Sequence, residues 1–465
     1  MRRYLKIPPC FWCVIWVHGW LAGALALEPV VEIEEEVYTY QPANNGAGPM
    51  WCAGSTCLVR VGPHVFASGL ETLPELKPLN NCRWTLFQRG HESWQRITPA
   101  DSGRTREPSP LAAFFDGRLF LSANPTLLDA SAAGGGPARP EIVMVSGRNP
   151  EKPPTRMLPV WRGHPQFTEH SYRSFAADAQ NGELILFQNI DYTHAEWAFF
   201  DRTGQWSAQG QLKWPWGADY EKPQPIRVCY ATVAIKDRAV YFCGVSDIVE
   251  PNSKWREFKR QLTGREWDYD FRRLFFTWTP DITREPFRDW IEVASREKTA
   301  GWIFPADLWV DAGGAVHLLW TERALDERLR EKFFPEAKQS HALNYAILES
   351  GKVVTRRALV EAAEGGSREV PSAGRFQVTP ENKLLVCYYV QGQDVAGRRV
   401  LENRLLEIGL RGARGSSVRI PFKKPFTSFF TATVRAGSPP SNTLELLGTQ
   451  EGKPNTISYG RVPLR

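Results

Sequence analysis

Apolar and polar positions along the chain alternate in short runs, and the runs come in pairs joined by tight turns. Asp116-Gly117, Asn181-Gly182 and Gly313-Gly314 are turns of the kind that matches the twist of a β-hairpin. The seven turn centres fall near positions 63, 117, 181, 237, 314, 382 and 439. A unit that recurs at such intervals predicts one supersecondary motif repeated seven times. The hairpins cover 59–68, 111–122, 172–187, 226–244, 306–320, 374–390 and 429–447.

A third apolar run follows each hairpin, and a polar turn usually leads on to a fourth. These third runs lie at 83–87, 141–145, 197–200, 274–278, 345–348, 404–408 and 457–459. Four antiparallel strands repeated radially form the blades of a β-propeller. An array of two-sheet sandwiches is the alternative, and it accounts less well for the regular spacing. The sequence therefore predicts an all-β protein, a seven-bladed propeller of four-stranded antiparallel blades.

The two ends of the chain are expected to close the ring. The last unit ends at its third strand, so it lacks an outer strand of its own. The segment Val30–Tyr38 alternates acidic and apolar residues, as suits an exposed edge strand. We expect it to pair beside residues 457–465 and to complete the seventh blade.

The first residues have the pattern of a secretory signal peptide. Three basic residues among the first six precede an apolar stretch, which ends at the small residues of Ala24-Leu25-Ala26. We expect residues 1–26 to be cleaved, leaving a single propeller domain over 27–465 in a secreted or periplasmic protein. An uncleaved membrane anchor is the alternative, and Pro8, Pro9 and His18 argue against it.

Charge and cysteine content narrow the class of partner. Removing the leader takes away three basic residues and lowers the formal charge from +6 to about +3. That balance, without a basic tract, argues against nucleic acid. Six cysteines remain, and their spacing matches no zinc site. We expect Cys229 and Cys243 to lie close across one hairpin, while Cys52 or Cys57 with Cys82 is another possible pair and buried free thiols a third possibility.

Two turns between third and fourth strands carry a family signature. Residues 201–206 (Asp-Arg-Thr-Gly-Gln-Trp) and 89–94 (Arg-Gly-His-Glu-Ser-Trp) resemble degraded Asp-boxes of sialidase-like propellers, also called BNR repeats. The blade around Glu169-His170-Ser171-Tyr172 and His194-Ala195-Glu196-Trp197 resembles the BNR-type propellers that include ulvan-type polysaccharide lyases. The resemblance extends as a pattern over most of the chain and is specific only in that blade. It implies a carbohydrate-active enzyme that uses paired histidines, a tyrosine and an arginine.

Propeller geometry indicates which residues can meet. The loops before each innermost strand and between each second and third strand open on one rim, over the central channel. Residues there are the candidates for a binding or catalytic site. They are Glu169, His170, Tyr172, Arg173, Tyr192, His194, Arg227, Tyr230, Trp302, Asp307, Glu322 and Arg375.

The chemistry of these side chains suits an acidic sugar. A uronate lyase needs an arginine at the sugar carboxylate, a base for the C5 proton and an acid for the leaving oxygen. His170, His194, Tyr230 and Arg227 are the expected catalytic set. The residues expected to bind substrate are Glu169, Tyr172, Arg173, Trp302, Asp307, Glu322 and Arg375. An arginine at the start of an inner strand needs a carboxylate partner such as Asp307, Glu169 or Glu322, or an anionic ligand. Of Arg227 and Arg375, we expect one to face the open pocket beside His170 or His194 and to bind an anionic ligand.

Sialidase chemistry is a second possibility. It requires three arginines, for which Arg173, Arg227 and Arg375 are available, and an acid, for which Asp307 is available. The first blade, however, lacks the Arg-Ile-Pro start of true sialidases. Two insertions, at about 249–270 and 323–340, are expected on the same rim, the second as a short amphipathic helix. Each is either a lid or a packed excursion at the propeller edge.

The sequence thus predicts a monomeric exported propeller that acts on an anionic polysaccharide or glycan by lyase or hydrolase chemistry. No cofactor is required by these residues, although a divalent cation is left open. The alternative is a propeller without catalytic activity that binds a glycan or a protein, because the same fold supports both kinds of function.

Overall fold

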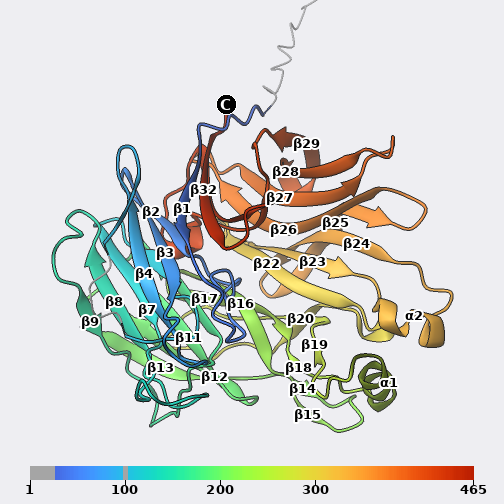
Figure 1. The fold of residues 1–465 in the computed structure, drawn as a ribbon, viewed down its shortest axis with the longest axis horizontal. Coiled ribbons are helices and arrows are strands. Elements are labelled where there is room, and N and C mark those ends of the chain that lie inside the picture. Colours follow the sequence, from blue (N-terminus) through green and yellow to red (C-terminus); the bar gives the residue numbers. More distant parts are fainter. Residues whose placement is uncertain (1–26, 98–102) are drawn as a thin grey trace, which may run out of the picture.

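The computed structural model describes residues 27–97 and 103–465, and the expected signal peptide lies outside them. Seven four-stranded antiparallel sheets follow one another around a ring in chain order (Figure 1). This confirms the predicted fold class. The innermost strands of the seven blades are β2 (Leu58–Val61), β6 (Leu111–Ala113), β10 (Arg173–Asp178), β16 (Val228–Lys236), β22 (Trp302–Val310), β26 (Arg368–Val378) and β30 (Phe426–Thr431).

The second, third and fourth strands of each blade extend outward from the channel. The second strands are β3 (His64–Thr72), β7 (Arg118–Ala123), β11 (Glu183–Ile190), β17 (Ala239–Ser246), β23 (Val316–Arg323), β27 (Leu384–Gln393) and β31 (Thr443–Gln450). The third strands are β4 (Cys82–Arg89), β8 (Glu141–Ser146), β12 (His194–Phe200), β20 (Arg273–Thr279), β24 (Ser340–Glu349), β28 (Arg399–Ile408) and β32 (Thr456–Pro463). The outer strands are β5 (Trp94–Arg96), β9 (Thr155–Met157), β13 (Trp206–Lys213), β21 (Ile291–Ser295), β25 (Lys352–Ala363), β29 (Arg414–Ile420) and β1 (Ile33–Thr39).

The N-terminal strand closes the ring, as predicted. β1 pairs antiparallel with β32, with Ile33 opposite Arg461 and Thr39 opposite Thr456, so the seventh blade takes its outer strand from the start of the domain (Figure 1). The innermost strands of neighbouring blades contact one another all round the ring, including β30 with β2. Because β1 is hydrogen-bonded within the last blade, the two ends of the chain hold each other in place.

A hydrophobic cluster fills the space between each pair of neighbouring blades. Alternate residues of every strand point to one face of its sheet, so each blade offers apolar side chains to both neighbours. Phe187 of the third blade, for example, meets Phe242 of the fourth at 5.1 Å between ring centroids. The same arrangement recurs at the other six junctions. Burial between blades, and not within one, therefore holds the ring together.

The two insertions lie where the second strand passes to the third. Between β17 and β20 come β18 (Ile248–Val249), helix α1 (Ser253–Thr263) and β19 (Tyr269–Asp270). Between β23 and β24 comes α2 (Glu327–Phe333), which packs against α1. Asn252 and Asp326 cap these helices by accepting backbone N–H groups. A short hairpin of β14 (Trp216–Gly217) and β15 (Gln224–Pro225) and the 3₁₀ turns η1 (Glu297–Thr299), η2 (Leu410–Gly412) and η3 (Val434–Ala436) complete the described elements.

The cysteines of the described residues form no disulfide, which is the third of the possibilities left open by the sequence. Cys229 and Cys243 lie on the two strands of one hairpin, as predicted, but Cys229 is opposite Val245 and Cys243 is opposite Thr232. A bulge after Cys229 shifts the register of β16 against β17, so the two cysteines are not opposite each other. All six cysteines within the described residues are buried free thiols. The closest approach joins a different pair, Cys52 and Cys57, with 3.7 Å between their Sγ atoms.

The centre of the channel is filled by polypeptide. Residues 51–56, which precede β2, run into it and contact several blades at once. Arg375 donates to the carbonyl of Ala53, and Arg435 to that of Gly54. A Cβ at position 54 would lie 2.3 Å from the carbonyl oxygen of Ala231, so glycine is required there. We call residues 51–56 the channel plug. No helix in the described part of the chain is both long and apolar enough to cross a membrane.

Candidate functional site

Aromatic side chains gather at the rim where the innermost strands begin. The indole of Trp51, at the start of the channel plug, lies at their centre. Its ring centroid is 4.9 Å from that of Tyr172, 5.3 Å from that of His170 and 5.8 Å from that of Tyr230. Tyr172 and Tyr230 meet edge to face at 4.9 Å. Two blades and the plug therefore contribute to a single group of rings.

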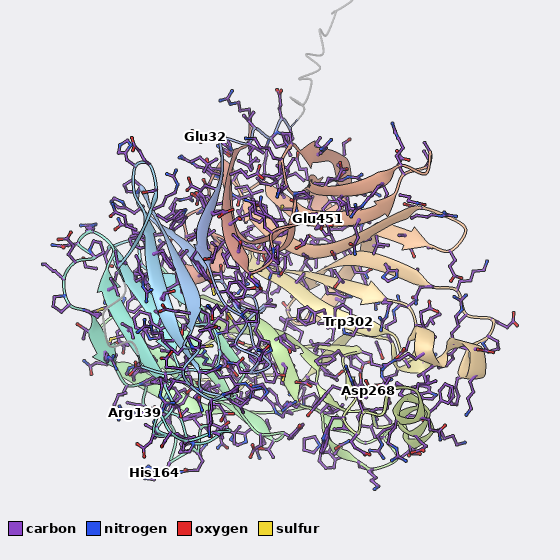
Figure 2. The ribbon with its side chains drawn as sticks, viewed as in Figure 1. Glu32, Arg139, His164, Asp268, Trp302 and Glu451 are labelled. Carbon is purple, nitrogen blue, oxygen red and sulfur yellow. The ribbon has the colours of Figure 1, made fainter. Side chains whose placement is uncertain are left out.

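The group extends toward the fifth blade. Phe304 lies 4.9 Å from Tyr230, and Trp302 stacks on Phe304 at 5.4 Å with 36% of its surface exposed. Figure 2 places Trp302 toward the side of the molecule that carries α1 and α2. Together, Trp51, His170, Tyr172, Tyr230, Phe304 and Trp302 form what we call the aromatic cluster. Flat, partly exposed rings of this kind offer contact area to the apolar face of a ligand.

Local backbone geometry aims Tyr230 at this cluster. The residue has φ of 51°, an unusual conformation for a tyrosine, at the bulge of β16. The bulge lies between Cys229 and Thr232 and interrupts the pairing of β16 with β17 there. It turns the Tyr230 side chain out of the regular alternation of the strand. Strained positions of this type are over-represented at functional sites. Because Tyr230 also touches Phe304, Trp51 and Tyr172, the surrounding rings hold the conformation in place.

A buried carboxylate orients His170. Oε1 of Glu107 lies 2.9 Å from Nδ1 of His170 and accepts the backbone N–H of Ser171 at 3.2 Å. The Glu107 side chain is 1% exposed, whereas that of His170 is 36% exposed. Since a carboxylate only accepts, a neutral His170 carries its proton on Nδ1 and presents Nε2 as an acceptor. A histidine held in this way is arranged to take up a proton.

A cavity of about 10 Å³ lies beneath the aromatic cluster. Its lining includes Trp51, Tyr172 and Tyr230 from the cluster, with Glu107 and Arg173 below them. Oε2 of Glu107 is buried and has no hydrogen-bond partner among the described residues, and the Arg173 guanidinium is 4.0 Å away. The volume is about that needed for one water molecule, and the polar groups could hold one.

Arg227 lies beside the cluster, in a cage of tyrosine rings. Its guanidinium is 3.9 Å from the centroid of Tyr192, 5.4 Å from that of Tyr172 and 5.7 Å from that of Tyr269. The Tyr192 and Tyr269 hydroxyls share a hydrogen bond of 2.8 Å, which closes the cage. Asp247, 1% exposed, accepts Nη2 of Arg227 at 2.9 Å through its carboxylate and Nε at 3.0 Å through its carbonyl. The charge of Arg227 is therefore matched within the protein.

The environment keeps the tyrosines protonated. Burial raises the pKa of Tyr172 and that of Tyr230, and the negative charge of Asp247 acts in the same direction on both. Burial also raises the pKa of Tyr269 to about 12. Tyrosines of this kind are proton donors and not bases at neutral pH.

Three of the four expected catalytic residues converge. His170 and Tyr230 both contact Trp51, and Arg227 contacts Tyr172. His194 is different: on the third strand of its blade, its Nδ1 lies 2.7 Å from the Thr193 hydroxyl and its Nε2 3.0 Å from the buried Glu196 carboxylate. Both ring nitrogens of His194 are therefore engaged by its own strand and turn.

Most of the expected substrate-binding residues are buried in internal contacts. Glu169 accepts the N–H of Gly136 at 2.8 Å, and Glu322 accepts Nε of Arg296 at 2.6 Å. Three others lie in the channel. Arg173 donates to the carbonyls of Ser122 and Pro108, and Asp307 binds Arg435. Arg375 donates to the carbonyls of Ala306, Gly374 and Ala53. Of this set, Tyr172 and Trp302 alone join the aromatic cluster.

The expected pairing of the arginines takes a different form in the structure. Arg227 pairs with Asp247, which is none of the three carboxylates proposed from the sequence, and Arg375 is held by backbone carbonyls. The proposed partners Asp307, Glu169 and Glu322 bind Arg435, Arg106 and Arg296 instead. Both arginines are 7% exposed, so neither projects openly into the rim.

Sequence reasoning missed Trp51, Glu107 and Asp247. All three lie in irregular segments outside the strands, where the repeat pattern gives no register. Asp247 directly follows β17, the second strand of its blade. It therefore begins a loop between a second and a third strand, which the propeller geometry places at the rim. Glu107 and Trp51 depend on long-range packing of the loop before β6 and of the channel plug. No group of three or more His, Cys, Asp or Glu suited to a metal ion occurs within the described residues.

Comparison with known proteins assigns no family. No family model matches the sequence, and no curated protein is significantly similar to it. Among solved structures, a protein of unknown function from Dyadobacter fermentans matches at a TM-score of 0.46 and 11% identity, over 94% of this chain and 99% of that one. An α-L-arabinanase of Penicillium chrysogenum complexed with arabinobiose matches at 0.42 and 11%, over 93% and 98%. An apocarotenoid oxygenase of Synechocystis matches at 0.41 and 12%, over 87% and 91%.

Proposed function

We propose that this protein is an exported glycan-processing propeller whose site is the aromatic cluster, with His170 as its proton-transfer group. The observation that carries the proposal is the 2.9 Å contact between His170 and the buried Glu107, beside the rings of Trp51 and Tyr172 at the rim. Sugar rings bind to proteins through their apolar faces, and Trp51 and Trp302 offer such surfaces. The leader pattern of residues 1–26 supports export.

The finer chemistry that these residues fit is β-elimination on a uronate-bearing glycan. Nε2 of His170 takes the C5 proton of the uronate, the C4–O bond to the leaving sugar breaks, and a C4=C5 double bond forms. The Tyr230 hydroxyl, which stays protonated because burial raises its pKa, gives a proton to the leaving oxygen. The ring of Tyr172 meets that of Tyr230 edge to face at 4.9 Å and positions it.

A second function, glycan binding without catalysis, is favoured by one observation. Asp247 already matches the charge of Arg227, so the arginine that a lyase would place on the uronate carboxylate has an internal partner. A propeller that recognises sugar rings by stacking alone would need no such arginine. It would bind neutral and acidic glycans through the same aromatic cluster.

The test uses the chain without residues 1–26 and a panel of uronate-rich and neutral polysaccharides. Product with the ultraviolet absorbance of an unsaturated uronate is expected from at least one uronate-rich substrate. His170→Asn and Tyr230→Phe should abolish it, whereas His194→Asn, a matched histidine of the same blade, should retain it. Calorimetric binding without product would favour the second function. Neither binding nor product from any glycan, or full activity of His170→Asn, would refute the proposal.

A further inference from the structure

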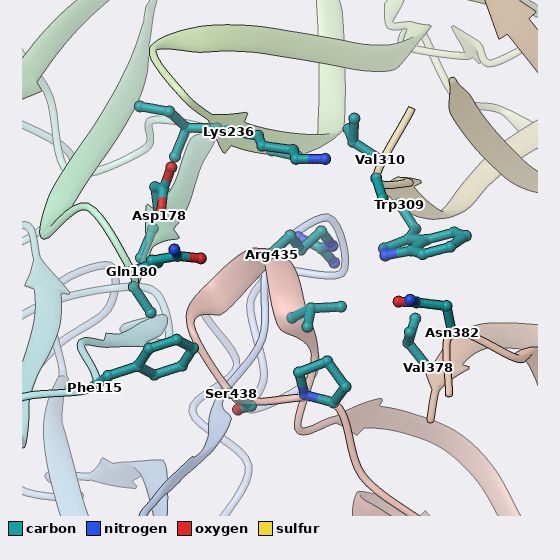
Figure 3. Close-up of a pocket in the computed structure, with 17 residues that line it drawn as sticks. Phe115, Asp178, Gln180, Lys236, Trp309, Val310, Val378, Asn382, Arg435 and Ser438 are labelled. Atoms are coloured by element: carbon teal, nitrogen blue, oxygen red, sulfur yellow. The ribbon is translucent and has the colours of Figure 1, made fainter. Parts of the chain in front are cut away.

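A second pocket opens at the opposite end of the central channel. It has a volume of about 310 Å³ and lies among the turns that join innermost to second strands (Figure 3). The channel plug separates it from the aromatic cluster, since Gly54 in the plug accepts Nη1 of Arg435 in the pocket at 2.8 Å. We call this space the turn pocket. Its size is that of a small-ligand site.

A buried arginine faces the turn pocket. The side chain of Arg435, in η3, is 3% exposed and donates Nε to Asp307 at 2.8 Å. Its third nitrogen, Nη2, has no hydrogen-bond partner in the part of the chain that the structure describes. Figure 3 shows the guanidinium between Gln180 on one wall and Trp309 and Asn382 on the other. Nη2 is therefore left for an acceptor that occupies the pocket.

Cationic side chains gather around Arg435. Arg375 is buried near Asp307 but donates only to backbone carbonyls, so the Asp307 carboxylate pairs with Arg435 alone. Burial lowers the pKa of Arg375 to about 10; Asp307 opposes this shift and Arg435 adds to it. Lys236 adds an ammonium at the pocket wall, where it donates to the carbonyl of Asp311 and keeps other N–H groups available. An anion in the pocket would accept from Lys236 and Arg435.

The other residues that line the turn pocket indicate which further groups a ligand would need. The side-chain amides of Gln180 and Asn382 are exposed and form no hydrogen bond with another described residue. The carboxylate of Asp178 is occupied by Asn181 and by the N–H of Asp237. Phe115, 54% exposed, and Trp309 flank the space with aromatic faces. Amides and rings around a buried arginine suit a hydroxylated ligand that bears a carboxylate.

We propose that the turn pocket binds a small sugar acid of monosaccharide size. Its carboxylate accepts from Nη2 of Arg435 and from Lys236, its hydroxyls bond the Gln180 and Asn382 amides, and its apolar face lies on Trp309. This site is independent of the chemistry assigned to the aromatic cluster, because the channel plug lies between them and no residue is shared.

Calorimetric titration of the chain from residue 27 with D-glucuronate tests the proposal. Saturable one-to-one binding is expected, with at least tenfold weaker affinity in Lys236→Met and in the double variant Gln180→Ala/Asn382→Ala. Trp302→Ala, in the aromatic cluster, and Lys352→Met, an exposed lysine on β25, should bind as the unaltered protein does. D-glucose, of the same size without the carboxylate, should bind at least tenfold more weakly.

The proposal is overturned by no binding of glucuronate, by equal binding of glucose, or by affinity unchanged in the Lys236 and amide variants. Loss of binding in Trp302→Ala alone would place the sugar acid at the aromatic cluster and would equally reject the turn pocket. Arg435→Lys should also weaken binding, with its fold checked by thermal melting; if it does not fold, the surface variants decide, since Lys236, Gln180 and Asn382 are not core residues.

Discussion

The Arg227–Asp247 pair provides the sharpest test of how the rim works. If Arg227 served a uronate carboxylate, replacing it would weaken ligand binding and leave the fold intact. In the structure, Asp247 is 1% exposed and the Arg227 side chain 9%, with two hydrogen bonds between the residues. Arg227→Met would leave the buried carboxylate without its cation. We therefore expect this variant to lose stability first.

The size of the loss follows from burial. Removing one partner of a buried ion pair costs about 3–5 kcal/mol, because the other charge stays buried and unpaired. Unfolding entropy near 2.1 cal/mol/K per residue amounts to about 0.9 kcal/mol/K for a chain of roughly 440 residues. A loss of about 4 kcal/mol then lowers Tm by about 4–5 °C. Removing both charges in Arg227→Met/Asp247→Asn should recover about half of this loss or more.

Thermal melting and urea unfolding of the three variants measure these values, and glycan titration is run on the same samples. Arg399→Met serves as the control, because Arg399 is 74% exposed in its pair with Glu451 and should change stability by less than about 1 kcal/mol. The reasoning fails if Arg227→Met melts with the unaltered protein while glycan binding is lost. That result would return Arg227 to the role of a ligand-binding residue.

Two further predictions concern other parts of the propeller. Hydrogen bonds from Arg83 and Arg96 lower the pKa of Glu71 to about 2, below its ordinary 4.5, so its contribution to stability is present above about pH 4.5 and is lost as the pH falls toward 2. The Glu71 side chain is 33% exposed, so solvent screens its ion pairs, and we expect Glu71→Gln to cost about 1 kcal/mol of stability at pH 7. The variant should also lose less stability than the unaltered protein as the pH falls from 4.5 to 2. An unchanged loss over this range would contradict the lowered pKa of Glu71. Cys52 and Cys57, with Sγ atoms 3.7 Å apart, should be the first cysteines joined by a mild disulfide oxidant, and peptide mass spectrometry should find that link before any involving Cys82, Cys229, Cys243 or Cys387. A first link between any other pair would contradict this prediction.

The sequence by itself determined the fold, because each blade is specified locally. A tight hairpin turn such as that at Asn181-Gly182 requires a left-handed backbone conformation, which Gly182 adopts with φ of 69°. The alternation of apolar residues on both sides of such turns sets the strand register. Seven repeats that cannot bury both faces alone must pack side by side. The missing strand of the last unit likewise predicted the pairing of β1 with β32. His170, Tyr230 and Arg227 met at one rim because the start of every inner strand faces the same way.

Only the tertiary structure decided which charges remain available at that rim. His194 is engaged by Glu196 and Arg227 by Asp247, and neither contact has a sequence signal, since hydrogen-bond partners across a bulge or a loop depend on the final packing. Trp51 and Glu107 reach the site through irregular segments held by distant groups, such as the Arg435 guanidinium on Gly54 and the Ser171 N–H on Glu107. The blades of a propeller are specified by local sequence patterns that repeat along the chain. The contacts inside its channel depend on residues far apart in the sequence, because each buried polar group pairs with a group that lies near it only once the ring has closed.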